Sequence, residues 1–177
     1  MRFLQLFNDY AQPGGEAKSV ERIFRVLSTR YEVVKFRVSG KDWSGPNAPG
    51  KLAQFRKTLF NREVADRALE VSRREQCDAW IIHNAFPVLS PAIYERALKH
   101  NIPIIQFLHN FRPFSISGTL WFQGKNHPEV LLPGGLWREV QAGAWQDSRI
   151  KSAVLGLALS RLRRAGWLNA VKAWVGI

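Results

Sequence analysis

Two histidine-asparagine pairs follow apolar runs in this sequence, and they are its best-placed candidates for chemistry. The first pair is His83 and Asn84, and the second is His109 and Asn110. The runs are separated by enough residues for one helix, as the crossover between neighbouring parallel strands requires. Open α/β sheets bind ligands at the carboxyl edge of such strands. We therefore expect these four side chains to lie at one edge of a sheet.

The residues after the second run offer two kinds of chemistry. His109 can donate a hydrogen bond to a substrate hydroxyl or take up a proton near neutral pH, and Arg112 can hold a phosphate. The alternative is a loop histidine that makes a structural hydrogen bond. That alternative weighs more for His83 and Asn84, because asparagine is common where a strand passes into a loop.

A glycine pair lies between the first predicted strand and the first predicted helix, in the sequence Pro13-Gly14-Gly15-Glu16. Glycine lets backbone N–H groups approach a phosphate closely, and the N-terminus of a helix adds a favourable field. A tight turn with no ligand is the alternative. The spacing differs from the G-x-G-x-x-G pattern of dinucleotide-binding sites, so the sequence argues against an NAD-type site.

Other common types of site have no support in the sequence. Histidines and carboxylates do not occur at metal-ligand spacing, so we predict neither a metal nor a cofactor. A Gly-x-Ser-x-Gly elbow is absent, which argues against a hydrolase of that type. The single cysteine, Cys77, excludes an internal disulfide framework and fits a reducing cytoplasm.

The order of elements predicts how these residues are positioned. Apolar spacing indicates strands alternating with helices up to Arg112, and this order favours an α/β fold with a Rossmann-like, doubly wound, mostly parallel sheet. The predicted strands are residues 3–7, 32–38, 80–83 and 103–108, and the predicted helices are 16–30, 51–76 with a break near 60–62, and 91–100. Residues 113–135 are expected to form a long loop over the carboxyl edge of the sheet.

The C-terminal segment is basic and carries apolar residues at helical spacing. No acidic residue follows Asp147. We divide the chain into an α/β domain, residues 1–147, and a basic amphipathic helical tail, residues 148–177, with a break near Gly166. Trp167 and Trp174 would suit a helix lying on anionic lipid. The alternative is a tail packed on the sheet or on a further domain.

The net charge indicates an anionic partner. The chain has 26 Lys and Arg residues against 14 Asp and Glu residues, a formal charge of +12. Nucleic acid, an acidic membrane surface and a phosphorylated substrate all fit this charge. Nucleic acid is disfavoured, because the sequence has no recognised nucleic-acid motif. Neither a secretory signal nor a spanning apolar run is evident, so we expect a cytoplasmic protein, peripheral at the inner face of the membrane.

Taken together, these pieces resemble the N-terminal domain of the family 4 retaining glycosyltransferases, enzymes of the two-domain GT-B type. The likeness lies in Gly14-Gly15-Glu16 after the first strand, in the segment from Ile82 to Pro91, and in Leu108-His109-Asn110-Phe111-Arg112. These pieces occur in the family's order and spacing up to Arg112, with weaker likeness beyond. The fold that the resemblance implies agrees with the sheet expected above.

The resemblance implies transfer of a sugar from a nucleotide-sugar donor to a polysaccharide or lipid-linked acceptor, without a metal. By this likeness Gly14 and Gly15 would face the donor diphosphate, with Glu16 opening the helix behind them. His109 would be the catalytic residue beside the transferred sugar. The residues on the acceptor side would be Asn84, Asn110 and Arg112.

Two departures from the family remain. The donor site of the family lies mainly in a second domain, so this chain is expected to be inactive alone and to need a separate donor-binding domain. Many relatives also carry cysteines in the long loop, which has none here. A non-catalytic module that binds a membrane or a partner is the alternative function.

Overall fold

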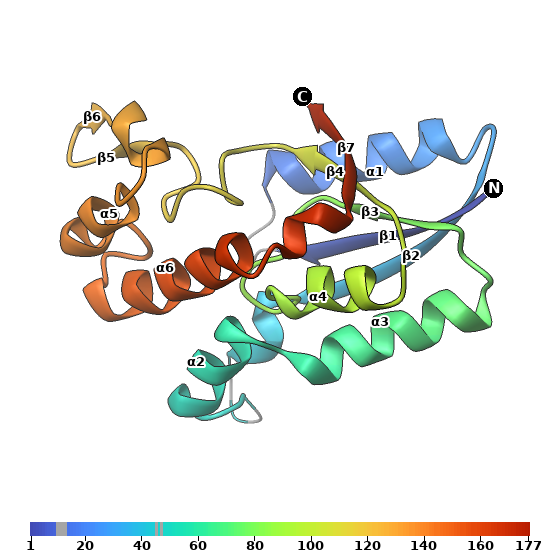
Figure 1. Cartoon of the computed structure of the whole chain (residues 1–177), viewed down its shortest axis with the longest axis horizontal. Coiled ribbons are helices and arrows are strands. Elements are labelled where there is room, and N and C mark those ends of the chain that lie inside the picture. The colour runs from blue at the N-terminus through green and yellow to red at the C-terminus, as the bar shows by residue number, and fades with distance from the viewer. Residues whose placement is uncertain (10–13, 45, 47) are drawn as a thin grey trace.

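A five-stranded parallel sheet forms the centre of the protein (Figure 1). The computed structural model describes every residue except 10–13, 45 and 47. The strand order is β2-β1-β3-β4-β7, and every neighbouring pair is parallel. The strands are β1 (Arg2–Asp9), β2 (Glu32–Ser39), β3 (Ala79–Ile82), β4 (Ile104–Leu108) and β7 (Val171–Gly176). The expected Rossmann-like α/β class is therefore confirmed.

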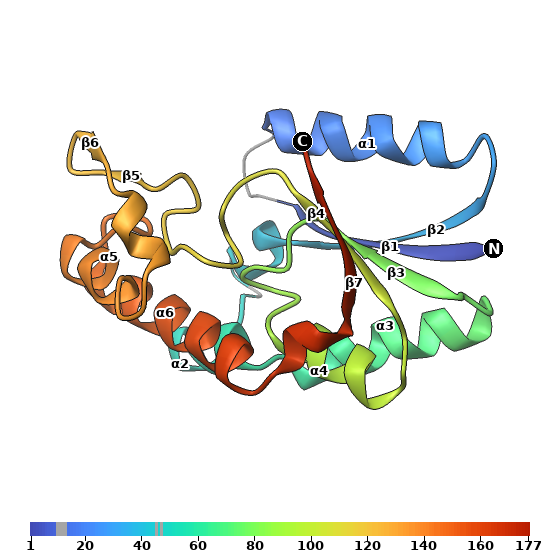
Figure 2. The same ribbon diagram turned by 45° about the horizontal axis from the view of Figure 1, so that its top comes forward.

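The helices cover both faces of the sheet, as Figure 2 shows. One face carries α1 (Gly15–Leu27). The other face carries α3 (Arg62–Arg74), α4 (Ala92–Lys99) and α6 (Arg149–Arg164), with α2 (Lys51–Leu59) packed against α6. The expected break near residues 60–62 separates α2 from α3, where the buried Asn61 side chain accepts a hydrogen bond from Val64 N at 3.5 Å.

Alternation along the strands decides which side chains share a face. Leu4 and Ile82 belong to the large core under α3, α4 and α6, whereas Phe3 and Ile81 pack with Leu27 of α1. Successive side chains of a strand point to opposite faces. Gln5, His83 and His109 stand at the same alternate positions as Phe3 and Ile81, so the α1 face of the sheet receives all three.

The segment after β4 has more local structure than a loop. It contains the short antiparallel pair β5 (Trp121–Phe122) and β6 (Lys125–Asn126), a 3-10 turn at Pro128–Leu131, and then α5 (Leu136–Ala142). The fully buried Glu139 of α5 accepts hydrogen bonds from Ser115 Oγ, Ile116 N and Ser117 N at 2.7–2.8 Å. This carboxylate fixes the stretch that follows Arg112.

The prediction of a helical tail over residues 148–177 is wrong after Gly166. The helix α6 ends at Arg164, Gly166 has a φ of 68°, and residues 171–176 form β7, which pairs with β4. The edge of β4 supplies backbone partners that helical spacing cannot reveal. The strand joins these residues to the sheet that we assigned to residues 1–147.

The tail tryptophans also differ from the expectation of a lipid-facing helix. The rings of Trp167 and Phe60 lie 5.5 Å apart, and the Arg161 guanidinium lies over both rings. Trp174 belongs to β7 and contacts Phe114 at 5.6 Å. The apolar stripe of α6 is buried in the core, so packing on the sheet is the alternative that holds for this helix.

Candidate functional site

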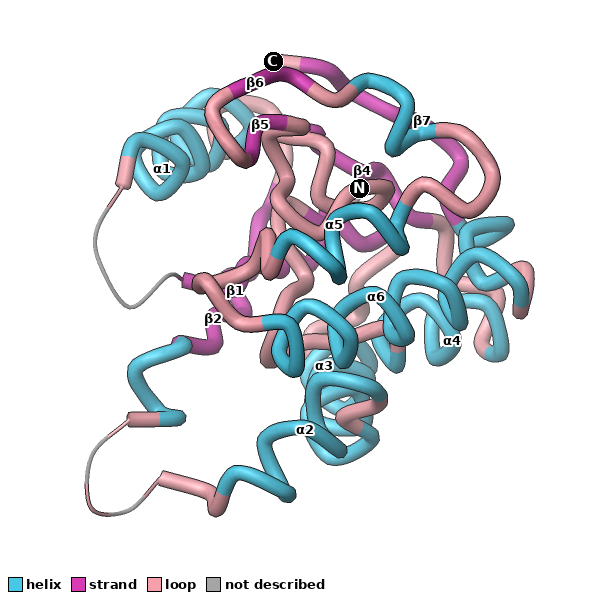
Figure 3. The backbone as a smooth tube through the Cα atoms, turned by 90° about the vertical axis from the view of Figure 1, so that its left-hand side faces the viewer, coloured by secondary structure: helices cyan, strands magenta, loops and turns pink. Residues whose placement is uncertain are grey.

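The carboxyl edge of the sheet brings together motifs that are far apart in the sequence. Figure 3 looks onto this edge, with α1 on one side and α2, α5 and α6 on the other. Asn110 connects two of the motifs, because its Nδ2 donates to Glu16 Oε2 at 3.3 Å and its Oδ1 accepts from Arg112 N at 2.8 Å. The loop after β4 is thus joined to the first turn of α1.

The two predicted glycines lie at the start of α1. Gly14 is extended, with φ −129°, and Gly15 is the first helical residue. Among the described residues, no atom lies within 4 Å of a Cβ atom built on either glycine, so packing against them does not demand glycine here. Both glycines are at a helix N-terminus, where backbone N–H groups attract anions. Pro13, the residue before this pair in the motif, lies outside the described residues.

The two predicted histidines are in contact at the α1 face. The distance from His83 Nδ1 to His109 Nε2 is 2.9 Å, and the distance from Gln5 Nε2 to His83 Nε2 is also 2.9 Å. Gln5 Nε2 additionally donates to the Val20 carbonyl at 3.3 Å, which identifies this atom as the amide nitrogen. Gln5, which the sequence analysis did not single out, therefore begins a chain of three polar side chains.

The direction of each hydrogen bond among Gln5, His83 and His109 follows from the donor at Gln5. An amide NH₂ only donates, so His83 Nε2 must accept and the His83 proton resides on Nδ1. That N–H donates to His109, so His109 Nε2 accepts and the His109 proton resides on Nδ1. The arrangement presents His109 as a neutral imidazole whose Nδ1–H is available as a hydrogen-bond donor.

The surroundings of both rings favour the neutral form. Burial lowers the pKa of His83 to about 3, with further lowering from His109 and Arg37. Burial also lowers the pKa of His109. Of the two roles that the sequence allowed for His109, the geometry favours hydrogen-bond donation over uptake of a proton near neutral pH.

The side chain of Asn84 makes hydrogen bonds that hold the backbone in place. The side chain is buried, its Nδ2 donates to Asn8 O at 3.4 Å, and its Oδ1 accepts from Phe86 N at 3.1 Å. Both polar ends of the amide therefore hold backbone around the ends of β1 and β3. This pattern matches the structural alternative for the first pair, and an acceptor contact of Asn84 stays a prediction.

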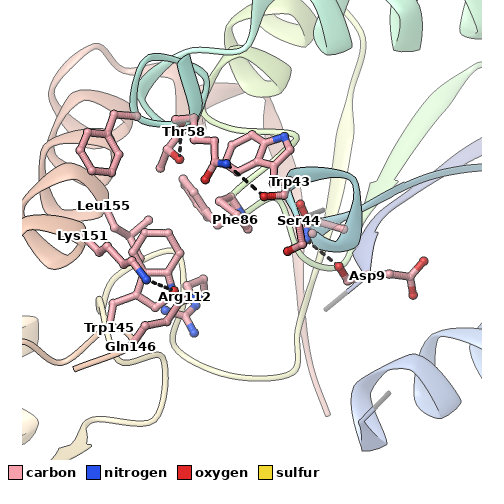
Figure 4. Close-up of a pocket in the computed structure, with 15 residues that line it drawn as sticks. Asp9, Trp43, Ser44, Thr58, Phe86, Arg112, Trp145, Gln146, Lys151 and Leu155 are labelled. Atoms are coloured by element: carbon pink, nitrogen blue, oxygen red, sulfur yellow. Dashed lines mark hydrogen bonds between the residues drawn. The ribbon is translucent and has the colours of Figure 1, made fainter. Parts of the chain in front are cut away.

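A pocket of about 320 Å³ lies beside this edge, between the end of β1 and the helices α2 and α6 (Figure 4). We call it the tryptophan pocket. Figure 4 places Trp145, Gln146, Arg112 and Lys151 along one side and Asp9, Trp43 and Ser44 along the other. Its lining residues are Asn8, Asp9, Gly40, Trp43, Ser44, Gln54, Phe55, Thr58, Phe86, Pro87, Arg112, Trp145, Gln146, Lys151 and Leu155.

Arg112 is the predicted site residue that lines this pocket, and its guanidinium is held in place. Its Nη1 donates to the Ile116 carbonyl. Gly118 has a φ of +78°, and a Cβ atom built there would lie 3.1 Å from the Arg112 Cζ. Both the positive φ and the close approach of the guanidinium therefore favour glycine at position 118.

Sequence reasoning missed most of the pocket. Trp43 lies in the segment rich in glycine and proline after β2. A tryptophan in such a loop could have indicated a ligand contact. Trp145 and Lys151 come from the C-terminal third of the chain and carry no local signal for this site. Among the residues that the structure describes, no group of three or more His, Cys, Asp or Glu side chains could hold a metal ion.

No family model matches the chain, and no curated protein matches it. A similar solved structure is a chain of the S. aureus MnaA-UDP co-structure, with 14% sequence identity and a TM-score of 0.42. The match covers 97% of this chain and 43% of that chain, so this chain spans less than half of its length.

Proposed function

We propose that this chain is the acceptor-side half of a glycosyltransferase that moves a sugar from a nucleotide-sugar donor to a polysaccharide or lipid-linked acceptor. The observation that carries the proposal is the hydrogen bond between Asn110 and Glu16. It joins the glycine motif to the histidine motif at one sheet edge, where open α/β folds bind ligands. A separate donor-binding domain would complete the site.

Apart from Asn84, each predicted residue has a role that its position supports. Backbone N–H groups at Gly14 and Gly15 would contact the donor diphosphate, because both residues lie at the N-terminus of α1. The Nδ1–H of His109 would donate to a hydroxyl of the transferred sugar. The hydrogen bond between Glu16 and Asn110 would hold the start of α1 against the loop after β4. Arg112 would contact the acceptor.

Nuclear magnetic resonance of the 177-residue chain tests this proposal. We expect UDP-glucose or GDP-mannose, at millimolar concentration, to shift the backbone amide signals of Gly14 and Gly15 and the ring signals of His109. Free glucose is the control and should leave the glycine signals unchanged. Nucleotide sugars that leave all three residues unchanged would contradict the proposed donor contact.

Activity tests the division of the enzyme into halves. We expect the chain alone to transfer no sugar, because the donor contacts of this proposal would come mainly from another domain. Release of nucleotide from the donor by purified chain, abolished in His109→Ala, would contradict the need for a second half while keeping the role of His109.

A second candidate function is docking on an anionic membrane surface. The surface formed by α5 and α6 favours this function. A groove of about 620 Å³ lies between α5 and α6, with Trp137 and Leu157 exposed in its lining. Arg163 and Arg164 line the same groove, which gives it the aromatic, apolar and cationic character of an interfacial site. No helix in the described part of the chain is long and apolar enough to cross a bilayer.

A further inference from the structure

The tryptophan pocket is lined by two cationic side chains, Arg112 and Lys151. Within the described residues, neither Arg112 nor Lys151 forms an ion pair with a carboxylate. The Lys151 ammonium donates to Gln146 Oε1 at 2.9 Å, and Arg112 is fixed by the Ile116 carbonyl. Figure 4 places both cationic side chains on the same side of the pocket.

The carboxylate of the pocket does not neutralise them. Asp9 lies on the opposite side of the pocket and pairs with Arg37, from Nη1 to Oδ2 at 3.7 Å. The like charges of Arg112 and Lys151 therefore face the pocket without an ion pair to Asp9 or to any other carboxylate of the described residues. Charge-assisted hydrogen bonds to a bound anion would relieve this repulsion, and the fixed guanidinium would lose little freedom on binding.

The rest of the lining suits a sugar ring. Trp43 and Trp145 contribute large apolar faces that can cover the C–H groups of a saccharide, together with indole N–H donors. Gln54 and Thr58 add polar groups, and Gln54 is held by hydrogen bonds to the Trp43 and Pro49 carbonyls at 3.0 and 2.8 Å. A volume of about 320 Å³ is at the small end of ligand pockets, which fits one or two sugar units.

We propose that the tryptophan pocket binds a saccharide that carries an anionic group, either phosphate or carboxylate. Arg112 and Lys151 hold the charge, and the ring lies against the tryptophans. The inference rests on the proposed function only where it takes this saccharide to be the acceptor. Binding itself is independent of sugar transfer and of any donor domain.

The test uses the whole chain and follows the indole N–H signals of its seven tryptophans by nuclear magnetic resonance. Trp43→Phe and Trp145→Phe assign the two signals of the pocket. We expect glucose 6-phosphate or methyl glucuronide to shift both signals, and the stronger of the two ligands identifies the anionic group. Glucose and inorganic phosphate should each bind at least about tenfold more weakly, because each lacks one half of the contacts.

Variants locate the charge contacts. We expect Arg112→Gln and Lys151→Gln each to weaken binding of the charged sugar by about tenfold, the effect of losing one charge-assisted hydrogen bond. Arg149→Gln, on the same helix as Lys151 but outside the pocket, should bind like the wild type. Because Lys151 is exposed, its variant should fold even if Arg112→Gln does not.

Three outcomes would overturn the inference: equal binding of glucose and glucose 6-phosphate, equal binding of inorganic phosphate and glucose 6-phosphate, or wild-type binding by Lys151→Gln. None of them depends on a donor. A failure of sugar transfer would therefore leave the pocket proposal standing, and a neutral ligand in the pocket would leave the transfer proposal standing.

Discussion

At the scale of single residues, the side-chain amide of Gln5 determines which ring nitrogen of His109 carries the proton. Gln5 donates to His83, and this forces the proton of each ring onto Nδ1. Protonating His109 on Nε2 would place two N–H groups against each other. A ligand at the sheet edge therefore meets a hydrogen-bond donor on His109 near neutral pH.

Replacing Gln5 should remove the preference of both histidines for the Nδ1–H tautomer. In the wild type at pH 7.5 we expect ¹H–¹⁵N correlation spectra to report the Nδ1–H form for His83 and His109. In Gln5→Met the donor to His83 Nε2 is lost, so both rings should become mixtures of tautomers. Gln141→Met, at an exposed glutamine of α5, is the control. Unchanged tautomers in Gln5→Met would contradict the assignment.

The buried His83 should make stability depend on pH. Its pKa is about 3 in the folded protein, against about 6.5 when unfolded, so below pH 6.5 the unfolded state binds more protons. Its contribution is complete above pH 6.5 and is lost as the pH falls toward 3. We expect the free energy of unfolding, from urea titrations between pH 7.5 and 5, to fall by up to about 1.4 kcal/mol per pH unit below 6.5.

Substitution assigns this pH dependence to one ring. His83→Gln should flatten the dependence of stability on pH, although it should also lower stability at pH 7.5. His100→Gln, at an exposed histidine, should leave the slope as in the wild type. An equal slope in His83→Gln and in the wild type would mean that another group is responsible.

At the scale of elements, the segment after β4 depends on backbone geometry to place Arg112. Gly118 and Gly124 share a φ of +78°, but only Gly118 lies against the Arg112 guanidinium. The buried Glu139 fixes residues 115–117 from the side of α5. The two glycines therefore form a natural pair for separating backbone strain from contact with Arg112.

An alanine at either glycine should cost about 1–2 kcal/mol of stability, the usual cost of a left-handed conformation for a residue with a Cβ atom. Only Gly118→Ala should also weaken glucose 6-phosphate binding, because its Cβ atom would displace the guanidinium. Thermal unfolding measures the first effect, and titration of the Trp43 and Trp145 indole signals measures the second. Equal binding of glucose 6-phosphate by the two variants would contradict a contact between Arg112 and this ligand.

At the scale of the whole molecule, the groove between α5 and α6 combines exposed apolar side chains with arginines. Trp137 and Leu157 are 63% and 62% exposed, whereas Trp167 packs inside the protein. The arginines beside them, Arg163 and Arg164, complete a surface suited to anionic lipid. The lipid contact that we propose therefore lies in this groove and not at the tail tryptophans.

Vesicle binding tests that face. We expect the chain to sediment with phosphatidylglycerol vesicles and to be released by salt, because screening weakens attraction between surface charges. Trp137→Gln and Leu157→Gln should each reduce binding several-fold. Trp174→Gln, at an exposed tryptophan of β7, should bind like the wild type. Equal binding to neutral phosphatidylcholine, or loss in Trp174→Gln alone, would contradict docking through the groove.

The sequence determined the elements up to β4, because alternating or helical spacing and the residues at element ends are local properties. It also determined that Asn110, His109 and the glycine motif share an edge, since parallel strands place their carboxyl ends together. Local spacing did not determine β7. Residues 171–176 form a strand because the open edge of β4 supplies hydrogen-bond partners, and that edge exists only in the folded sheet.

Tertiary structure alone decided the finer chemistry. The role of Gln5 depends on the alternation of three strands and on a carbonyl of α1, which together fix the protons of two histidines. The tryptophan pocket joins residues from the end of β1, from α2 and from α6. Those segments are distant in the chain and meet only when the core forms, because burial of apolar side chains, and not local spacing, brings them together.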